Sequence, residues 1–181
     1  MYLAEKNVND SESKQQFLRW YKSCHHFVSV LQMKKTFFLL SIICFCLSLS
    51  SFLKENNLSL VQDVFYQTNR FRKSQGLNEL IIRNDLNKIA QRHSEDMARG
   101  RVPFGHAGFY KRDALAKKDI KQLSSFAENV AFGPTSGKQV IDMWKNSAGH
   151  RRNLLGRFKY IGIGVAKDRN GRIYYTQVFA I

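Results

Sequence analysis

The sequence is poor in cysteine and in acidic residues. Only Cys24, Cys44 and Cys46 occur in its 181 residues, and none follows residue 46. A disulfide framework is therefore excluded for the rest of the chain, and a domain there must be held together by its apolar core alone. About 125 residues are enough to bury such a core. Asp and Glu number 14 against 29 Lys and Arg.

The shortage of acids leaves a large positive charge on the C-terminal part of the chain. From Lys54 onward there are 23 Lys and Arg against 11 Asp and Glu, a net charge of +12 by subtraction. Such an excess attracts polyanions at long range. Outside the cytoplasm the candidates are phosphate-rich wall polymers, lipopolysaccharide, anionic lipid and acidic glycans, and the alternative is a merely solubilising surface. No RNA- or DNA-binding motif accompanies the charge, which disfavours nucleic acid as the partner.

Charge is absent from one segment, Thr36–Leu53, which holds 18 residues and follows two lysines. A helix of that length spans about 27 Å, close to the hydrocarbon thickness of a bilayer. In one interpretation, residues 33–53 are a secretory signal peptide starting at Met33, and residues 1–32 are a mis-assigned start. In the other, residues 1–32 are a cytoplasmic tail and the apolar segment is a single membrane anchor. Both interpretations export the following domain, which is then secreted, periplasmic, or anchored outside the cytoplasm.

Residues 56–181 have the pattern of one α+β domain. The spacing of apolar residues predicts helices over 58–73, 84–99 and 136–147, a short apolar segment over 126–132, a helical turn over 150–155, and strands over 159–166 and 172–180. Asn84 is expected to cap the second helix, and Gly149 to interrupt the chain after the third. Gly162 and Gly164 leave one face of a strand without bulk, which predicts close approach of another backbone or a lined cavity.

Three polar side chains stand out in their local settings. His106 lies in a glycine-rich loop over 101–112, His150 opens a helical turn, and Glu128 interrupts the apolar run FAENVAF. Two imidazoles and one carboxylate suit Zn²⁺ with a water as fourth ligand, although spacings of 22 residues on each side of Glu128 match no compact metal motif. His93 is interpreted as a packed core histidine, and Asn129 as a scaffold residue.

Seven motifs follow one another along this domain. In chain order they are NRFR with GLNEL (69–80), AQRHSEDMA (90–98), GH (105–106), AENVA (127–131), WKNSAGHRRNLL (144–155), IGIGVA (161–166) and YYTQVFA (174–180). Together they resemble the CAP superfamily (cysteine-rich secretory proteins, antigen 5, pathogenesis-related 1), and specifically its cysteine-free, bacterial-type SCP-like domains.

The resemblance implies a three-layer α-β-α sandwich with a central cleft lined by two histidines and two acids. It places His106, Glu128 and His150 in that cleft, as candidate ligands of Zn²⁺ or another divalent metal. The second acid of many animal and plant relatives corresponds here to Ser147, three residues after Trp144, so this chain keeps a three-ligand set. Relatives have been linked to binding of sterols, lipids and divalent metal, and occasionally to proteolysis.

Two functions are compatible with these residues. The first is an exported binding module for a polyanionic envelope polymer, a lipid or a partner protein. The second is a hydrolase outside the cytoplasm, either through the zinc set or through a nominal Ser–His–acid combination of Ser147, His150 and Glu128. The serine alternative requires Ser147 within about 3 Å of His150, whereas Ser147 also suits the cap of the following turn. No complete catalytic set is evident, and we therefore expect a binding protein rather than an enzyme.

Overall fold

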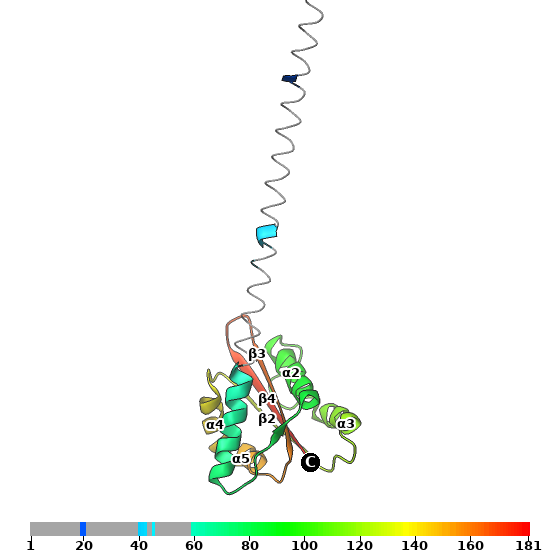
Figure 1. Ribbon diagram of the computed structural model, residues 1–181, viewed down its shortest axis with the longest axis vertical. Helices are drawn as coiled ribbons and strands as arrows, with labels where there is room; N and C mark the ends of the chain where they lie inside the picture. The colour runs from blue at the N-terminus through cyan, green and yellow to red at the C-terminus, as the bar shows by residue number, and fades with distance from the viewer. Residues whose placement is uncertain (1–18, 21–39, 43–44, 46–58) are drawn as a thin grey trace, which may run out of the picture. The chain divides into compact units, whose positions relative to one another are not determined.

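The computed structural model describes residues 19–20, 40–42, 45 and 59–181 (Figure 1). The chain divides into two compact units, Met1–Phe52 and Leu53–Ile181. The interpretations of residues 1–32 and 33–53 fall almost entirely outside the described residues and stay predictions. Among the residues that are described, no helix is both long and apolar enough to cross a membrane.

A four-stranded sheet, in the order β1-β3-β4-β2, forms the middle of the second unit. Its strands are β1 (Ile81–Ile82), β2 (Phe126–Phe132), β3 (Tyr160–Lys167) and β4 (Ile173–Ala180). β4 pairs antiparallel with both β2 and β3, and the short β1 pairs parallel with β3. β2 therefore lies at one edge of the sheet, bonded to a neighbouring strand on one side alone.

Helices cover both faces of this sheet. They are the helix over residues 59–74, α2 (Asn84–Ala98), α3 (Phe109–Asp119), α4 (Gly137–Lys145) and α5 (Ala148–Leu154). Figure 1 shows α2 and α3 on one side of the sheet, and helix 59–74, α4 and α5 on the other. The result is the α+β, three-layer α-β-α sandwich that the sequence predicts.

Alternation along the strands divides the apolar side chains between two cores. The larger core joins the sheet to helix 59–74, α4 and α5, and includes Val64, Val140, Trp144, Leu154, Ile161, Ile163, Val165, Tyr175 and Phe179. The smaller core joins the sheet to α2 and α3, and includes Leu86, Ile89, Ala90, Ala116, Ile120 and Val178. Trp144 is fully buried in the larger core and donates its indole N–H to the Val130 carbonyl at 3.1 Å.

Gly162 and Gly164 allow α2 to lie directly on β3. A Cβ at Gly162 would stand 2.3 Å from the carbonyl carbon of Leu86, and one at Gly164 would stand 2.2 Å from that of Ala90. Real Cβ atoms do not approach other atoms so closely, and the predicted close approach of another backbone is confirmed.

Two local predictions are wrong. Arg83 occupies the N-cap position of α2 and Asn84 is its first helical residue; no side-chain capping bond forms there. Gly149 does not break a helix but lies within α5, and the interruption falls at Asn146 and Ser147, between α4 and α5. A glycine in the first turn of a short helix is tolerated because few helical hydrogen bonds depend on it.

The sequence pattern did not predict α3, which begins inside the expected loop. Arg112 and Ala116 are its buried residues, so the helix has no apolar stripe that would identify it. Gly108 occupies the N-cap position with a left-handed backbone (φ 77°), which glycine adopts without strain. This turn directs the chain into α3 and carries Arg112 to the face of the sheet on which α2 packs.

Candidate functional site

Glu128 lies in the edge strand β2 and is 4% exposed. Because neighbouring residues of a strand point to opposite faces, Glu128 faces α3 while Ala127 and Asn129 face the α5 layer. Burying a carboxylate is costly unless it is paired and hydrogen-bonded. The surroundings of Glu128 therefore determine what this region can bind.

Arg112 of α3 supplies the main partner of that carboxylate. Its Nε donates to Oε2 of Glu128 at 2.6 Å and its Nη2 donates to Oε1 at 2.7 Å, a two-pronged ion pair. The remaining Nη1 donates to the carbonyl oxygen of Ala107 at 2.7 Å. Arg112 is itself only 8% exposed, so the pair lies out of contact with bulk water.

His106 is the second partner. Its Nδ1 lies 2.8 Å from Oε1 of Glu128, and its side chain is 50% exposed. Since an ionised carboxylate can only accept, Nδ1 carries the hydrogen and Nε2 is left without one when the ring is neutral. The carboxylate thus fixes the tautomer and the orientation of a solvent-accessible imidazole.

His93 of α2 lies beneath this pair. It is 3% exposed, as expected for a core histidine, but it also takes part in the site. Its Nε2 is 2.9 Å from the carbonyl oxygen of Gly105 and 4.0 Å from Oε1 of Glu128. Burial lowers the pKa of His93 more than the bond to Gly105 raises it, and the charge of Arg112 lowers it further. The neutral ring holds the loop that carries His106.

His150 approaches from α5, on the other side of the edge strand. Among the described residues its buried Nδ1 has no hydrogen-bond partner. Burial lowers the pKa of His150, and the charge of His106 lowers it further. The two histidines are therefore close enough to interact electrostatically, although no hydrogen bond joins His150 to His106 or Glu128 within the described part of the chain.

An amide network fixes α5 against β2. Nδ2 of Asn153 donates to the backbone oxygen of Glu128 at 3.1 Å and to Oδ1 of Asn129 at 2.9 Å. Nδ2 of Asn129 in turn lies 3.3 Å from the backbone oxygen of His150. Asn129 is fully buried, and its interpretation as a scaffold residue is confirmed. Sequence reasoning did not single out Asn153, although it lies in the motif that contains His150.

We call the side chains of His93, His106, Arg112, Glu128 and His150 the edge site. The structure brings the predicted residues His106 and Glu128 into direct contact and places His150 nearby. Ser147 occupies the N-cap position of α5, as expected, but its side chain makes no capping bond there. Within the described residues no hydrogen bond joins Ser147 to His150, and the serine relay is not assembled.

The edge site as arranged does not fit a divalent cation. Both carboxylate oxygens of Glu128 accept from Arg112, and Oε1 also accepts from His106. Over the ranges that the structure describes, no three His, Cys, Asp or Glu side chains are grouped so as to hold a metal ion. Metal binding by His106, Glu128 and His150 stays a prediction.

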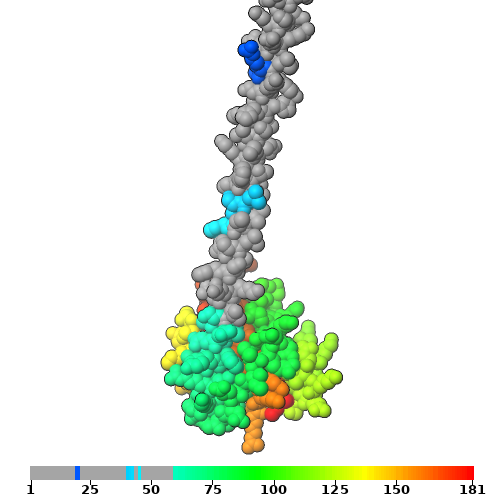
Figure 2. Space-filling view, viewed as in Figure 1, coloured from blue at the N-terminus to red at the C-terminus, as the bar shows by residue number. Residues whose placement is uncertain are grey.

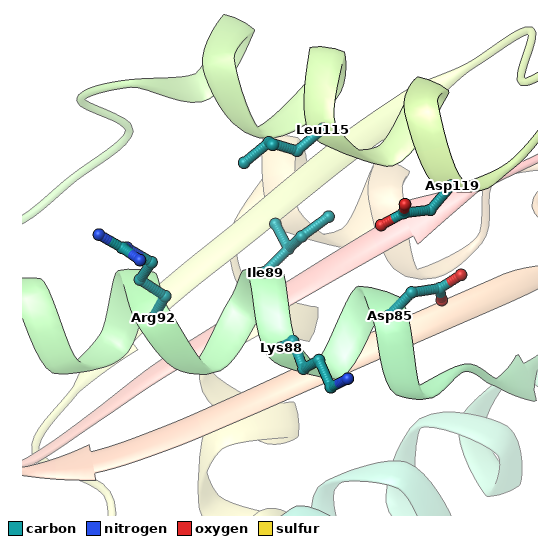
Figure 3. A pocket seen from close by; sticks show the side chains of 6 residues that line it. All are labelled: Asp85, Lys88, Ile89, Arg92, Leu115 and Asp119. Atoms are coloured by element: carbon teal, nitrogen blue, oxygen red, sulfur yellow. The ribbon is translucent and has the colours of Figure 1, made fainter.

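A separate groove of about 530 Å³ lies between α2 and α3. Figure 3 shows Ile89 and Leu115 facing one another across it, with Asp85 and Asp119 toward one end and Arg92 toward the other. None of the edge-site residues lines this groove. The groove is thus a concave surface whose lining does not include the predicted metal ligands.

The sequence profile of the cysteine-rich secretory protein family, CAP, matches residues 65–179. The chain belongs to this family. Two curated Bacillus subtilis relatives are each 33% identical, the uncharacterized protein YkwD over 113 residues and the uncharacterized membrane protein YlbC over 116. The matches cover 61% and 62% of this chain but only 43% and 32% of those relatives, so the chain corresponds to less than half of either.

Solved structures agree with the family and the fold. A crystal structure of an extracellular protein containing an SCP domain from Bacillus anthracis is 29% identical, with a TM-score of 0.59, over 68% of this chain and 40% of that one. A cysteine-rich secretory protein from Staphylococcus aureus is 28% identical, with a TM-score of 0.57, over 68% of this chain and 38% of that one. An outer surface protein of Borrelia burgdorferi shares the fold at 21% identity, with a TM-score of 0.54, over 64% of this chain and 87% of that one.

Proposed function

We propose that this chain is an exported CAP-domain protein whose activity is to bind an anionic polymer of the cell envelope. Export is supported by the uncharged segment Thr36–Leu53 and by the description of the Bacillus anthracis relative as extracellular. The observation that carries the binding proposal is a cluster of cations beside α5. We call Arg72, Lys145, Arg151 and Arg152 the α5 basic cluster.

Two of these cations, Lys145 and Arg151, lie over the half-buried ring of Phe71. Nζ of Lys145 lies 4.8 Å from the ring centroid and Cζ of Arg151 lies 5.7 Å from it. Arg152 follows on the same short helix and is exposed, and Figure 2 shows the surface of helix 59–74 adjoining that of α4. Within the described residues neither Arg151 nor Arg152 forms an ion pair, so both guanidinium groups are available to a ligand.

Arg72 adds a buried positive charge beneath this surface. It is 2% exposed, and its described hydrogen bonds go to backbone carbonyl oxygens: Asn78 at 3.0 Å, Leu154 at 2.8 Å and Gly156 at 2.9 Å. Burial lowers the pKa of Arg72, yet an arginine stays protonated in proteins. Its charge is offset by carbonyl dipoles and not by a carboxylate, so it raises the positive potential at α5.

Among the expected partners, a flexible polyanion fits this cluster better than a protein or a lipid. Guanidinium groups bind phosphate and carboxylate in a two-pronged geometry, and such contacts can be repeated along a polymer. Among the ion pairs of the described residues, one acid pairs with the cluster: Asp142, at 3.1 Å from Nζ of Lys145. Binding of this kind is expected to weaken steeply as salt concentration rises.

The test is a binding titration of the full chain, held in phosphatidylcholine nanodiscs without detergent, with inorganic polyphosphate as the probe for phosphate-rich polymers. Hyaluronan, phosphatidylglycerol vesicles and neutral dextran serve as parallel probes. Changing Arg151 and Arg152 together to Glu is expected to weaken polyphosphate binding at least about tenfold, a loss of about 1.4 kcal/mol.

A matched control separates this cluster from net charge. Lys118 and Lys121 are exposed near the end of α3, and changing both to Glu alters the net charge by the same amount. We expect that control to bind polyphosphate nearly as well as the unchanged chain. Equal losses of polyphosphate affinity in both double variants would show that net charge alone, and not the α5 basic cluster, governs binding. Tighter binding to the vesicles than to either polymer would favour the lipid alternative.

A hydrolase is the second candidate, and the Glu128–His106 contact is the observation that favours it. A carboxylate that orients an accessible imidazole is a common arrangement for a general base. The hydrolase could use zinc chemistry or a serine mechanism through Ser147. The serine mechanism would require a hydrogen bond between Ser147 and His150. Turnover of peptide or ester substrates by the unchanged chain that is lost in a folded His106→Gln variant would establish catalysis. If the unchanged chain turns over no more substrate than His106→Gln does, binding is left as the activity.

A further inference from the structure

The carboxylate at the predicted metal position is neutralised by a cation of the protein itself. We propose that Arg112 is the resident cation of the edge site, and that it makes the site independent of divalent metal. This inference concerns the edge site alone and does not depend on the polymer proposed above.

Both carboxylate oxygens of Glu128 already accept hydrogen bonds from the protein. Oε2 of Glu128 accepts from Nε of Arg112 at 2.6 Å, and Oε1 accepts from Nη2 at 2.7 Å and from Nδ1 of His106 at 2.8 Å. An ionised carboxylate offers about four lone-pair sites, and these donors occupy three of them. A zinc ion would have to approach the same oxygens to about 2.0–2.2 Å, directly beside the guanidinium of Arg112.

Burial and further hydrogen bonds hold the Arg112 side chain in place. Its side chain is 9% exposed, and Nη1 is tied to the carbonyl oxygen of Ala107 at 2.7 Å. Its backbone N–H donates to the carbonyl oxygen of Gly108 at 3.1 Å, within the first turn of α3. A guanidinium keeps its charge at every accessible pH, so a divalent ion beside Glu128 would meet a buried like charge in a region of low dielectric.

Arg112 also performs the structural task that a metal would otherwise perform. It satisfies the buried carboxylate, and the carboxylate in turn orients His106. Through Ala107 the same guanidinium holds the loop in which His106 lies. The geometry thus makes Arg112 a positioning residue for His106.

The experiment is calorimetric titration of Zn²⁺ into the full chain in detergent micelles. Cys24, Cys44 and Cys46 are changed to serine throughout, because thiolates bind zinc tightly. Arg112→Met removes the charge at similar volume, and Arg112→Lys retains a positive charge. We expect one-site binding in Arg112→Met that is at least about tenfold tighter than in Arg112→Lys or in the unchanged chain. The added change Glu128→Gln should remove this gain.

Two results would overturn the proposal. One is Zn²⁺ binding by the unchanged chain that is lost in His106→Ala, a variant expected to fold because the side chain is half exposed. The other is a folded Arg112→Met variant with no gain in zinc affinity. If Arg112→Met does not fold, the comparison of the unchanged chain with His106→Ala still decides: indistinguishable titrations support metal independence, and a loss refutes it.

Discussion

Replacing Glu128 by Gln removes a negative charge from the edge site and leaves the shape of the side chain nearly unchanged. The carboxylate is 4% exposed and its partner Arg112 is 8% exposed, so solvent cannot screen the charge that remains. The amide oxygen of Gln can still accept one hydrogen bond from the guanidinium of Arg112. The amide NH2, itself a donor, would point at the other N–H donor of Arg112 and could not accept from it. The variant therefore contains a buried cation without a counter-ion.

The expected loss follows from that burial. Removing one partner of a buried ion pair costs about 3–5 kcal/mol. For a domain of this size, about 4 °C of thermal midpoint corresponds to each kcal/mol, which gives a fall of roughly 12–20 °C. The double variant Arg112→Met, Glu128→Gln is expected to lose less than the sum of the two single changes, by at least about 1 kcal/mol, because neither charge is then buried alone.

The assay is thermal and urea unfolding of the full chain followed by circular dichroism. Glu79→Gln is the matched control, because Glu79 is exposed and the chemical change is the same. We expect Glu79→Gln to shift the midpoint by less than about 2 °C. A midpoint for Glu128→Gln within about 3 °C of the unchanged chain would refute the structural role of the ion pair and return Glu128 to the candidates for chemistry.

Two further predictions concern α2 and its contacts. Gly164→Ala is expected to destabilise the domain by about 3 kcal/mol or more in urea unfolding, because its Cβ would stand 2.2 Å from the backbone of α2. In the control Gly149→Ala the new Cβ would meet nothing within 4 Å, and this change should be neutral or stabilise the domain by up to about 1 kcal/mol. Equal effects of the two changes on the free energy of unfolding would contradict the packing of α2 on β3. The pKa of His93 is lowered by burial from 6.5, so the unfolded chain binds the proton more readily. Its contribution to stability is therefore complete above pH 6.5 and is lost as pH falls through that value toward the folded pKa. Unfolding midpoints measured from pH 8 to 5 should fall less in His93→Gln than in the unchanged chain, and parallel pH profiles would show that His93 does not carry this dependence.

The sequence predicts those parts of the fold that rest on periodicity. Leu86, Ala90 and His93 recur at helical spacing, and all are buried against the sheet. Gly162 and Gly164 alternate with large apolar residues, a pattern that predicted close approach of another backbone or a lined cavity, and the structure shows that backbone to be α2. In each case one physical requirement, burial of a stripe or approach of a backbone, repeats along the chain and leaves a readable pattern.

The edge site was predictable only in part, because its decisive contact leaves no pattern. His106 and Glu128 were recognisable as polar residues in unusual settings, and the structure joins them. Arg112 and Glu128 are 16 residues apart in the sequence and lie on different elements. The helix that carries Arg112, α3, buries too few side chains to be recognised from the sequence. The position of His150 likewise depends on side-chain amides of α5 and β2 that no spacing rule connects.

Lysine acetylation of the full chain with and without polyphosphate, read by mass spectrometry, shows whether the α5 basic cluster binds a polyanion. Lys145 lies in the cluster, whereas Lys118 and Lys121 lie near the end of α3 in the opposite layer. We expect saturating polymer to protect Lys145 from acetylation and to leave the labelling of Lys118 and Lys121 unchanged. Equal protection of all three lysines, or protection of Lys118 and Lys121 alone, would contradict binding at the cluster.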